Sequence, residues 1–235
     1  MKQHPVVSQT QWLEARKELL EREKALTRLN DEISALRRQL PWVKVEQVYS
    51  FDTEHGPQSL TELFAGRNQL VVYHFMFGPD WEQGCVSCSF WADHLDGLSV
   101  HLAHRNITLV VVSRAALQKL LAYRARMGWD FGWVSSLGTT FNQDFGVTFS
   151  AAEQAEGAVF YNDEQHHSPL EEAPGLSVFY RDEQGQIYHT YSCYERGLDC
   201  LNTAYQLMDR VPLGRNEQAL AYPMAWLRRH DDYED

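Results

Sequence analysis

The sequence has no long apolar run and no excess of basic residues. Among its 235 residues no stretch of about 18 consecutive apolar residues occurs, so we expect no membrane-spanning helix. Asp and Glu together number 32 against 21 Lys and Arg, which gives a formal net charge of −11. Because nucleic acids and anionic membranes are bound through basic patches, we expect neither as a partner.

The start of the sequence also lacks the features of a secretory signal. It contains no apolar segment of the signal type and no cleavage site of small residues, so we expect a cytoplasmic protein. What is present, 44% hydrophobic and 12% aromatic residues, is enough to form a substantial core. This composition excludes a disordered chain.

Cysteine is scarce, with four residues in the chain. Structural disulfides rarely persist in the cytoplasm, and a chain of this length does not need them for stability. We therefore expect buried thiols, metal ligands or redox groups. Two of the four, Cys85 and Cys88, form a Cys-x-x-Cys motif within the segment FGPDWEQGCVSCSFW (77–91).

Residues 8–40 predict one long amphipathic helix that ends before Pro41. Its apolar residues recur every seven positions, at Trp12, Leu19, Leu26, Ile33 and Leu40. Such a stripe fits packing against the helix's own domain, and it also fits pairing across a homodimer, because heptad spacing forms a coiled-coil seam. In both cases residues 1–41 are expected to be a helical extension outside the core fold.

From residue 43 onward, short strands and helices alternate. Strands are predicted at 43–51, 69–77, 106–113 and 131–136, and helices at 59–66, 85–104 and 114–128. Two later segments, 176–180 and 186–192, flank a turn and predict a β-hairpin, which a helix at 198–210 follows.

The remaining segments have weaker patterns. Residues 137–172 are polar and irregular, and we expect them to be an insertion before the hairpin. The core domain is then predicted to span residues 42–211. Residues 212–235 show little periodicity and are expected to be a tail on the surface.

The order β-α-β-α-β, followed by a hairpin and a helix, predicts a three-layer α/β domain with a central mixed sheet. Cys85 falls where the first buried strand of this series passes into its helix. This junction is at the carboxyl end of a parallel strand, where sheets of this kind place their sites.

A thiol at the first turn of a helix is more acidic than a free thiol, because unpaired backbone N–H groups favour an anion there. Cys85 would therefore be the nucleophile, and Cys88, one turn further, would resolve the mixed disulfide. A zinc site and inert thiols are the alternatives. Zinc would need two further ligands, and the spacing of Cys193 and Cys200 does not match the usual zinc motifs.

Long segments of the chain resemble a bacterial family of thioredoxin-like proteins of uncharacterised function, which are predicted to be dithiol–disulfide oxidoreductases. The segments are LPWVKVEQVY, VYHFMFGPDWEQGC, CSFWADHL, GWVSSLGTTFNQDFGV, PGLSVFYRDEQGQIYHTYS and ERGLD. The resemblance extends over most of the chain, from about residue 22 to 216.

The resemblance implies a thioredoxin-like fold and a function without a bound cofactor or metal, because electrons pass through sulfur. It also implies that Cys85 and Cys88 are the active-site dithiol. Pro174 stands where this fold places a cis-proline whose backbone binds an extended substrate strand. An ordinary trans bond before Pro174 is the alternative.

Two departures limit what the resemblance implies. Peroxiredoxins carry a Pro, a Thr or Ser and a Cys at fixed offsets, but counting from Pro79 places Gln83 and Val86 at the last two positions. A dedicated peroxidase is therefore disfavoured. The inner pair Val86-Ser87 also replaces the Gly-Pro of the thioredoxin motif, so the redox potential does not carry over.

Two other residues are candidates for roles at the site. Trp81 is a candidate for an apolar rim that contacts the substrate. Cys193, near the end of the second hairpin strand, is predicted at the same sheet edge as the dithiol and two strands away from it. It is a candidate relay, with Cys200 as its own partner; the alternative is that both are buried thiols.

These observations predict a cytoplasmic thiol–disulfide oxidoreductase that acts on a disulfide-containing protein or a small thiol. One alternative is a weak peroxide reductase that uses the same dithiol. The other is a non-enzymatic scaffold that assembles through its N-terminal helix.

Overall fold

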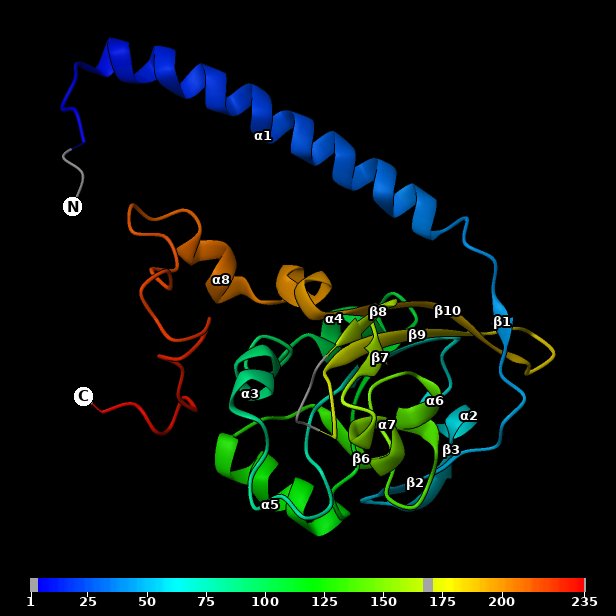
Figure 1. Cartoon of the computed structure of the whole chain (residues 1–235). Helices are drawn as coiled ribbons and strands as arrows, with labels where there is room; N and C mark the ends of the chain where they lie inside the picture. The colour runs from blue at the N-terminus through cyan, green and yellow to red at the C-terminus, as the bar shows by residue number, and fades with distance from the viewer. Residues whose placement is uncertain (1–3, 167–170, 235) are drawn as a thin grey trace. The chain divides into compact units, whose positions relative to one another are not determined.

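The computed structural model describes residues 4–166 and 171–234. The chain separates into two compact units, with the division between Pro41 and Trp42. The first unit contains helix α1 (Gln9–Arg37), and the second contains all the strands (Figure 1). In the part of the chain that the structure describes, no helix is both long enough and apolar enough to cross a membrane.

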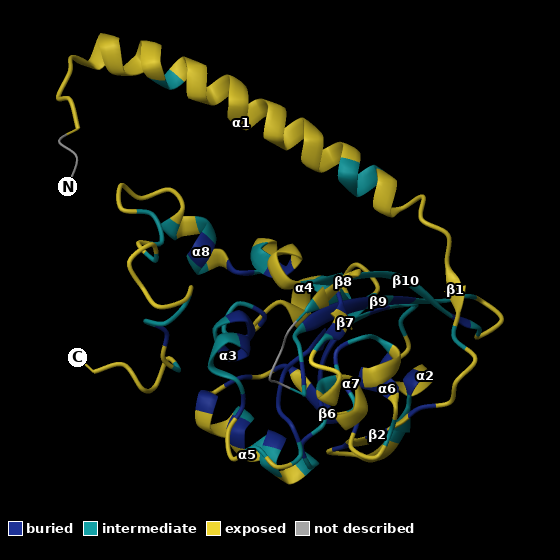
Figure 2. Ribbon diagram, in the orientation of Figure 1, coloured by how far each residue is buried: buried dark blue, intermediate teal, exposed yellow. Residues whose placement is uncertain are grey.

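Helix α1 begins with a capping box. The Ser8 side chain accepts a hydrogen bond from the Gln11 N–H, and the Gln11 side chain accepts one from the Ser8 N–H, so two of the unpaired donors at the helix start are satisfied. No residue of α1 is buried, and its apolar stripe is exposed except at Ile33, which is half-buried (Figure 2).

The second unit is built on an eight-stranded sheet with the order β1-β10-β9-β4-β5-β6-β2-β3. In that order the strands are Val43–Lys44, Ile187–Tyr194, Gly175–Arg181, Gln69–His74, Ile107–Ser113, Gly132–Ser135, Ser50–Thr53 and Gly56–Ser59. Strands β4, β5 and β6 are parallel, whereas β9 is antiparallel to β4 and β10 is antiparallel to β9. The predicted mixed sheet is confirmed, and this strand order is that of a thioredoxin-like fold.

Helices cover both faces of the sheet (Figure 1). Helices α3 (Val86–Ala92), α5 (Leu117–Met127) and α8 (Thr203–Met208) pack on one face, and α2 (Leu60–Leu63) and α6 (Phe141–Asp144) pack on the other. Alternation along β4 supplies both cores, because Tyr73 belongs to the first cluster and Leu70 and Val72 belong to the second. The central strands are accordingly buried (Figure 2).

Two predicted elements are divided in the structure. The helix expected at 85–104 forms α3 and α4 (Ser99–Ala103), and Gly97 lies between them with a φ of 76°, a conformation that does not continue a helix. The strand expected at 43–51 forms β1 and β2 at opposite sides of the sheet. Between them Val45 and Tyr49 pack against the second core cluster, so the segment crosses that face.

The insertion expected at 137–172 contains regular elements of its own. They are α6, α7 (Ala151–Ala155), β7 (Val159–Tyr161) and β8 (Glu164–His166), and the last two pair as a separate sheet. Phe149, Val159 and Tyr161 form a small core there. Residues 167–170 of this prediction lie outside the described residues.

The closing helix expected at 198–210 is shorter than predicted. A 3₁₀ turn, η1 (Glu195–Leu201), precedes α8. Residues 212–234, here called the C-terminal segment, follow. The expectation of a surface tail is wrong for part of this segment, because Leu227 is buried and Met224 and Trp226 pack against the first core cluster.

Candidate functional site

The Cys-x-x-Cys motif lies where the loop that follows the central strand β4 enters α3. Cys85 is the N-cap residue of α3, and its N–H donates to the Met76 carbonyl at 3.1 Å. Gly84, the residue before Cys85, packs closely against two aromatic rings. A Cβ at Gly84 would lie 2.7 Å from a ring carbon of Phe75 and 3.1 Å from one of Tyr123, so only glycine fits beside the first cysteine.

The two sulfur atoms have different surroundings. Cys85 is half-buried, whereas Cys88 is buried with 2% of its surface exposed. The Cys85 Sγ accepts a long hydrogen bond from the Cys88 N–H at 3.5 Å, and the Cys88 Sγ accepts one from the Met76 N–H at 3.5 Å. The outer sulfur is therefore the more accessible to a substrate.

Acidity differs between the two thiols in the same sense. The hydrogen bond from the Cys88 thiol is the main reason that the pKa of Cys85 falls to about 7. The N–H groups of Cys88 and Ser87 and the charge of Arg229 lower it further, against burial, which raises it. Burial, followed by the interaction with Cys85, raises the pKa of Cys88. At neutral pH the negative charge of the pair therefore resides on Cys85.

Tyr73 adds a second donor at the inner sulfur. Its side chain is 1% exposed and hydrogen-bonds to Cys88, and together with the Met76 N–H it opposes the rise in the pKa of Cys88. Both donors favour a Cys88 thiolate whenever that thiolate forms. The sequence carried no signal for this role, because Tyr73 occurs within a continuous apolar run.

The C-terminal segment reaches the motif through Arg229. Its Nη2 donates to the Gly84 carbonyl at 2.8 Å, and its Nε donates to the Tyr123 Oη at 2.6 Å. The Tyr123 hydroxyl in turn bonds to Ser89 Oγ at 2.9 Å, and Ser89 Oγ donates to the Cys85 carbonyl at 2.9 Å. This connected set of hydrogen bonds holds the backbone on both sides of Cys85.

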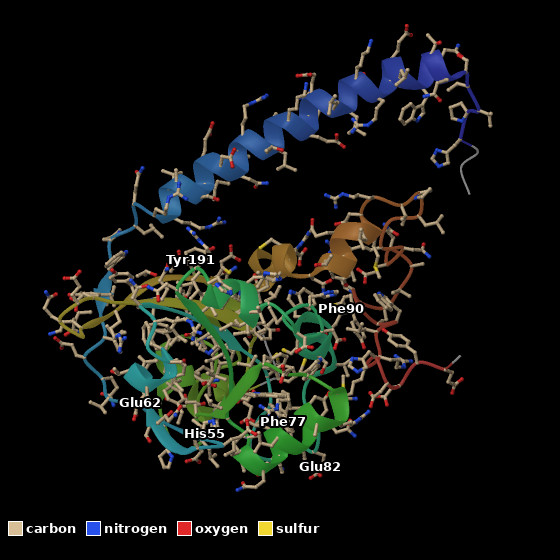
Figure 3. The ribbon with its side chains drawn as sticks, turned by 180° about the vertical axis from the view of Figure 1, so that it is seen from behind. His55, Glu62, Phe77, Glu82, Phe90 and Tyr191 are labelled. Atoms are coloured by element: carbon tan, nitrogen blue, oxygen red, sulfur yellow. The ribbon has the colours of Figure 1, made fainter. Side chains whose placement is uncertain are left out.

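Aromatic contacts join the same segment to α3. Phe90 packs edge-on against Trp226, with ring centroids 5.8 Å apart, and against Tyr205 at 5.3 Å. Figure 3 shows Phe90 on the side of α3 that faces the C-terminal segment. The sequence gives no signal for this arrangement, since residues 212–235 lack periodicity.

The peptide bond before Pro174 does not have the expected cis conformation. Within the described residues there is no cis peptide bond, so the bond before Pro174 is trans, which was the alternative. The Pro174 carbonyl accepts a hydrogen bond from Tyr161 Oη at 2.5 Å, and the preceding Ala173 N–H donates to the Val147 carbonyl. Both groups are thus engaged within the domain, and a role of Pro174 in binding a substrate strand stays a prediction.

Trp81 is half-buried and packs against the first core cluster. Lys119 Nζ holds its loop by donating to the carbonyls of Pro79 and Trp81, both at 3.1 Å. Trp81 therefore belongs in part to the core. Glu82, in the same loop, is exposed at the surface (Figure 3).

Cys193 lies on β10 opposite Leu176 of β9, which is itself opposite Tyr73 of β4. Two strand spacings, roughly 10 Å, therefore separate its backbone from that of Tyr73. Cys193 packs against the same core cluster as Cys88. Cys200 is exposed in η1, where its thiol donates to the Gly197 carbonyl at 3.5 Å.

A buried carboxylate, Glu172, lies two residues before Pro174. It is 2% exposed, and burial raises its pKa to about 7 although Arg114 Nη1 is 3.1 Å away. Its carboxylate also accepts a hydrogen bond from the N–H of Phe77, in the interior of the domain (Figure 3). Glu172 therefore ties the end of the insertion to the loop that carries the motif. No pattern in the sequence predicts this role for Glu172.

A cavity of about 910 Å³ lies beside the dithiol. Ser87, Cys88 and Trp91 of the motif helix line one wall, and Pro174 also lines the cavity. The opposite wall belongs to η1, α8 and the C-terminal segment. Across residues 4–166 and 171–234, His, Cys, Asp and Glu form no group of three or more suited to a metal ion.

Comparison with known protein families shows which family the chain belongs to. A family model described as "Bacterial protein of unknown function (DUF899)" matches residues 1–233. The resemblance to a bacterial family of uncharacterised function is thereby confirmed. A search of curated proteins found no match to the chain.

Several solved structures are similar to the chain at low sequence identity. Peroxidoxin BcpB from Mycobacterium tuberculosis is 13% identical, with 72% of this chain and 96% of that chain covered and a TM-score of 0.45. Peroxiredoxin Q from Xanthomonas campestris is 14% identical, with coverages of 68% and 96% and a TM-score of 0.42. A putative thiol:disulfide interchange protein DsbE from Chlorobium tepidum is 10% identical, with coverages of 72% and 97% and a TM-score of 0.39.

Proposed function

Given that the chain belongs to this bacterial family of unknown function (DUF899), we propose that it is a thiol–disulfide oxidoreductase that cycles Cys85 and Cys88 between dithiol and disulfide. One observation carries the proposal. A half-buried thiol with a pKa of about 7 lies one helical turn from a buried thiol, at the end of a central parallel strand. A thiolate at neutral pH is the form that attacks a disulfide.

The reaction proceeds in two exchanges. The Cys85 thiolate attacks a substrate disulfide RS–SR′, forms a Cys85–SR bond and releases R′S⁻, which takes up a proton. Cys88 then loses its proton, attacks the Cys85 sulfur and releases RS⁻, which is protonated in turn. Two electrons pass from the cysteine pair to the substrate, and the products are RSH, R′SH and the Cys85–Cys88 disulfide.

The surroundings of Cys88 support its role as the resolving thiol. Its raised pKa keeps the proton in place until the mixed disulfide has removed the charge of Cys85. The Met76 N–H and the Tyr73 hydroxyl then stabilise the developing thiolate. A thiol donor, as in a reducing cytoplasm, regenerates the dithiol. We propose a disulfide-containing protein or a small disulfide as the substrate.

Reduction of insulin disulfides by the reduced protein tests this function. Cys85→Ser is expected to abolish turnover, and Cys88→Ser is expected to accumulate a mixed disulfide that mass spectrometry detects. Cys200→Ser, which alters an exposed thiol outside the motif, is the control and should leave turnover unchanged. Turnover that survives Cys85→Ser contradicts the proposal, and absence of turnover in the unaltered protein favours the non-enzymatic scaffold.

A further inference from the structure

The cavity beside the dithiol has the size of a small-molecule site. Its volume of about 910 Å³ falls within the range of roughly 300–1,000 Å³ that such sites occupy. Tyr73, Met76 and Cys88 line it on the side of the dithiol. Cys85 is not among the lining residues, but its Sγ accepts a hydrogen bond from the Cys88 N–H, so it lies next to this wall. A disulfide held in the cavity therefore lies close to the cysteine pair.

The opposite wall is fixed by ion pairs. Arg215 contacts Asp209 at 2.8 Å and Asp199 at 3.2 Å, and its guanidinium lies 3.8 Å from the centroid of the Tyr205 ring. Asp199 also pairs with Arg196 at 3.0 Å. These two guanidinium groups and two carboxylates neutralise one another and leave no net charge for a ligand.

Two further carboxylates line the cavity. Glu217 accepts hydrogen bonds from Tyr205 Oη at 2.9 Å, Trp226 Nε1 at 2.7 Å and the Met224 N–H at 3.0 Å. Burial raises its pKa, but these bonds outweigh burial and the net shift is downward, so Glu217 is ionised at neutral pH.

The second of these carboxylates, Glu195, accepts a hydrogen bond from Asn162 at 2.9 Å and lies 3.5 Å from His166 Nδ1. Glu195 and Glu217 give the cavity two more carboxylates than guanidinium groups. A cation is attracted to such a lining and an anion is repelled, and the low dielectric of the cavity walls strengthens both effects.

From this geometry we infer that the cavity binds a low-molecular-weight disulfide with cationic ends, of the diamine disulfide class. The inference rests on the proposed function for its reaction. The ammonium groups are drawn to Glu195 and Glu217, and the central S–S bond lies at the wall formed by the motif. One substrate molecule takes two electrons and two protons from Cys85 and Cys88 and leaves as two aminothiols.

The binding step is tested without redox chemistry. Isothermal titration calorimetry of the reduced protein compares 1,6-diaminohexane, hexane-1,6-diol and suberate, which share a six-carbon spacer and differ in charge. We expect the diamine to bind most tightly and added salt to weaken its binding. Equal affinity for all three probes would overturn the inference.

The reaction step uses a matched series of disulfides. The protein is oxidised with cystamine, 2-hydroxyethyl disulfide or 3,3′-dithiodipropionate, and each rate is divided by the rate with free dithiothreitol. We expect this ratio to be about tenfold higher for cystamine than for the dianion at low salt. Glu195→Gln should reduce the preference about threefold. Glu183→Gln, in the turn between β9 and β10, is the control and should not change it.

The outcomes separate the two proposals. Reduction of all three disulfides without a charge preference overturns the cationic substrate and leaves the oxidoreductase in place. Diamine binding without any disulfide reduction supports the cavity assignment and contradicts the oxidoreductase. A loss of preference in Glu183→Gln equal to that in Glu195→Gln attributes the preference to overall charge and also overturns the inference.

Discussion

Arg229 Nη2 donates a hydrogen bond to the carbonyl of Gly84 at 2.8 Å, across 145 positions of sequence. Gly84 immediately precedes Cys85, so a guanidinium of the C-terminal segment lies beside the backbone of the more acidic thiol. The charge of Arg229 contributes to the lowered pKa of Cys85. The C-terminal segment is thus part of the site.

Arg229→Ala is expected to raise the pKa of Cys85 above about 7, because the variant loses a favourable charge and the bond to Gly84. The thiolate absorbance of the reduced unaltered protein and of reduced Arg229→Ala, each followed from pH 4 to 10, measures the shift. Arg228→Ala is the matched control and should leave the titration unchanged. An unaltered pKa of Cys85 in Arg229→Ala would mean that the C-terminal segment does not affect the acidity of this thiol.

The raised pKa of Glu172 predicts that the free energy of unfolding depends on pH. Its pKa is raised to about 7 in the folded protein, so the unfolded state loses its proton first and stability declines as pH rises from about 4.3 to about 7. Glu172→Gln cannot ionise, so the variant should lack a decline of roughly 3 kcal/mol. Urea unfolding at pH 5 and pH 8 tests this, and an equal decline in both proteins would contradict it.

Gly84→Ala is expected to destabilise the fold and to disturb the dithiol. The added Cβ would lie 2.7 Å from Phe75, so the ring or the loop must move, at a cost of about 1–3 kcal/mol. The midpoint temperature of thermal unfolding and the rate of insulin reduction should both fall. Gly132→Ala is the control, since a Cβ at Gly132 meets no atom within 4 Å. Unchanged stability in Gly84→Ala would count against the packing at this position.

The proposed relay through Cys193 is disfavoured by the position of its strand in the sheet. Disulfide formation needs Cα atoms within about 7 Å, and Cys193 lies on β10, two strands away from the strand that leads into the motif. We therefore expect Cys193→Ser to keep turnover within about twofold of the unaltered protein. A mixed disulfide between Cys193 and the motif, found by mass spectrometry after partial oxidation, would establish the relay instead.

The exposed stripe of α1 predicts self-association. Leu19, Leu26 and Leu36 are exposed on a helix with heptad spacing, and burying such side chains against a second copy removes apolar surface from water. Leu26→Gln should shift sedimentation equilibrium toward the monomer. Thr27→Gln, at the adjacent position, should not. A monomer in the unaltered protein would favour packing of α1 within its own chain.

Local patterns in the sequence were enough for the framework of the domain. Continuous apolar runs predicted β4 and β5, because a strand buried on both faces needs apolar side chains at every position. The Cys-x-x-Cys spacing sets the two thiols one helical turn apart without help from distant residues. The division of strand 43–51 was missed, because the pairing of each half depends on strands elsewhere in the sheet.

Tertiary structure alone decided which distant residues lie at the dithiol and at the loop that carries it. Tyr73, Glu172 and Arg229 are far apart in sequence, and an isolated Tyr, Glu or Arg carries no periodic signal of its destination. The wall that the C-terminal segment gives the cavity follows from the packing of that segment against α3. The Cys-x-x-Cys spacing by itself sets the two sulfurs one turn apart, where the Cys88 thiol can bond to Cys85. Contacts distant in sequence, such as the charge of Arg229 and the burial of Cys88, decide the remaining part of their acidity and access, because charge and burial depend on neighbours in space.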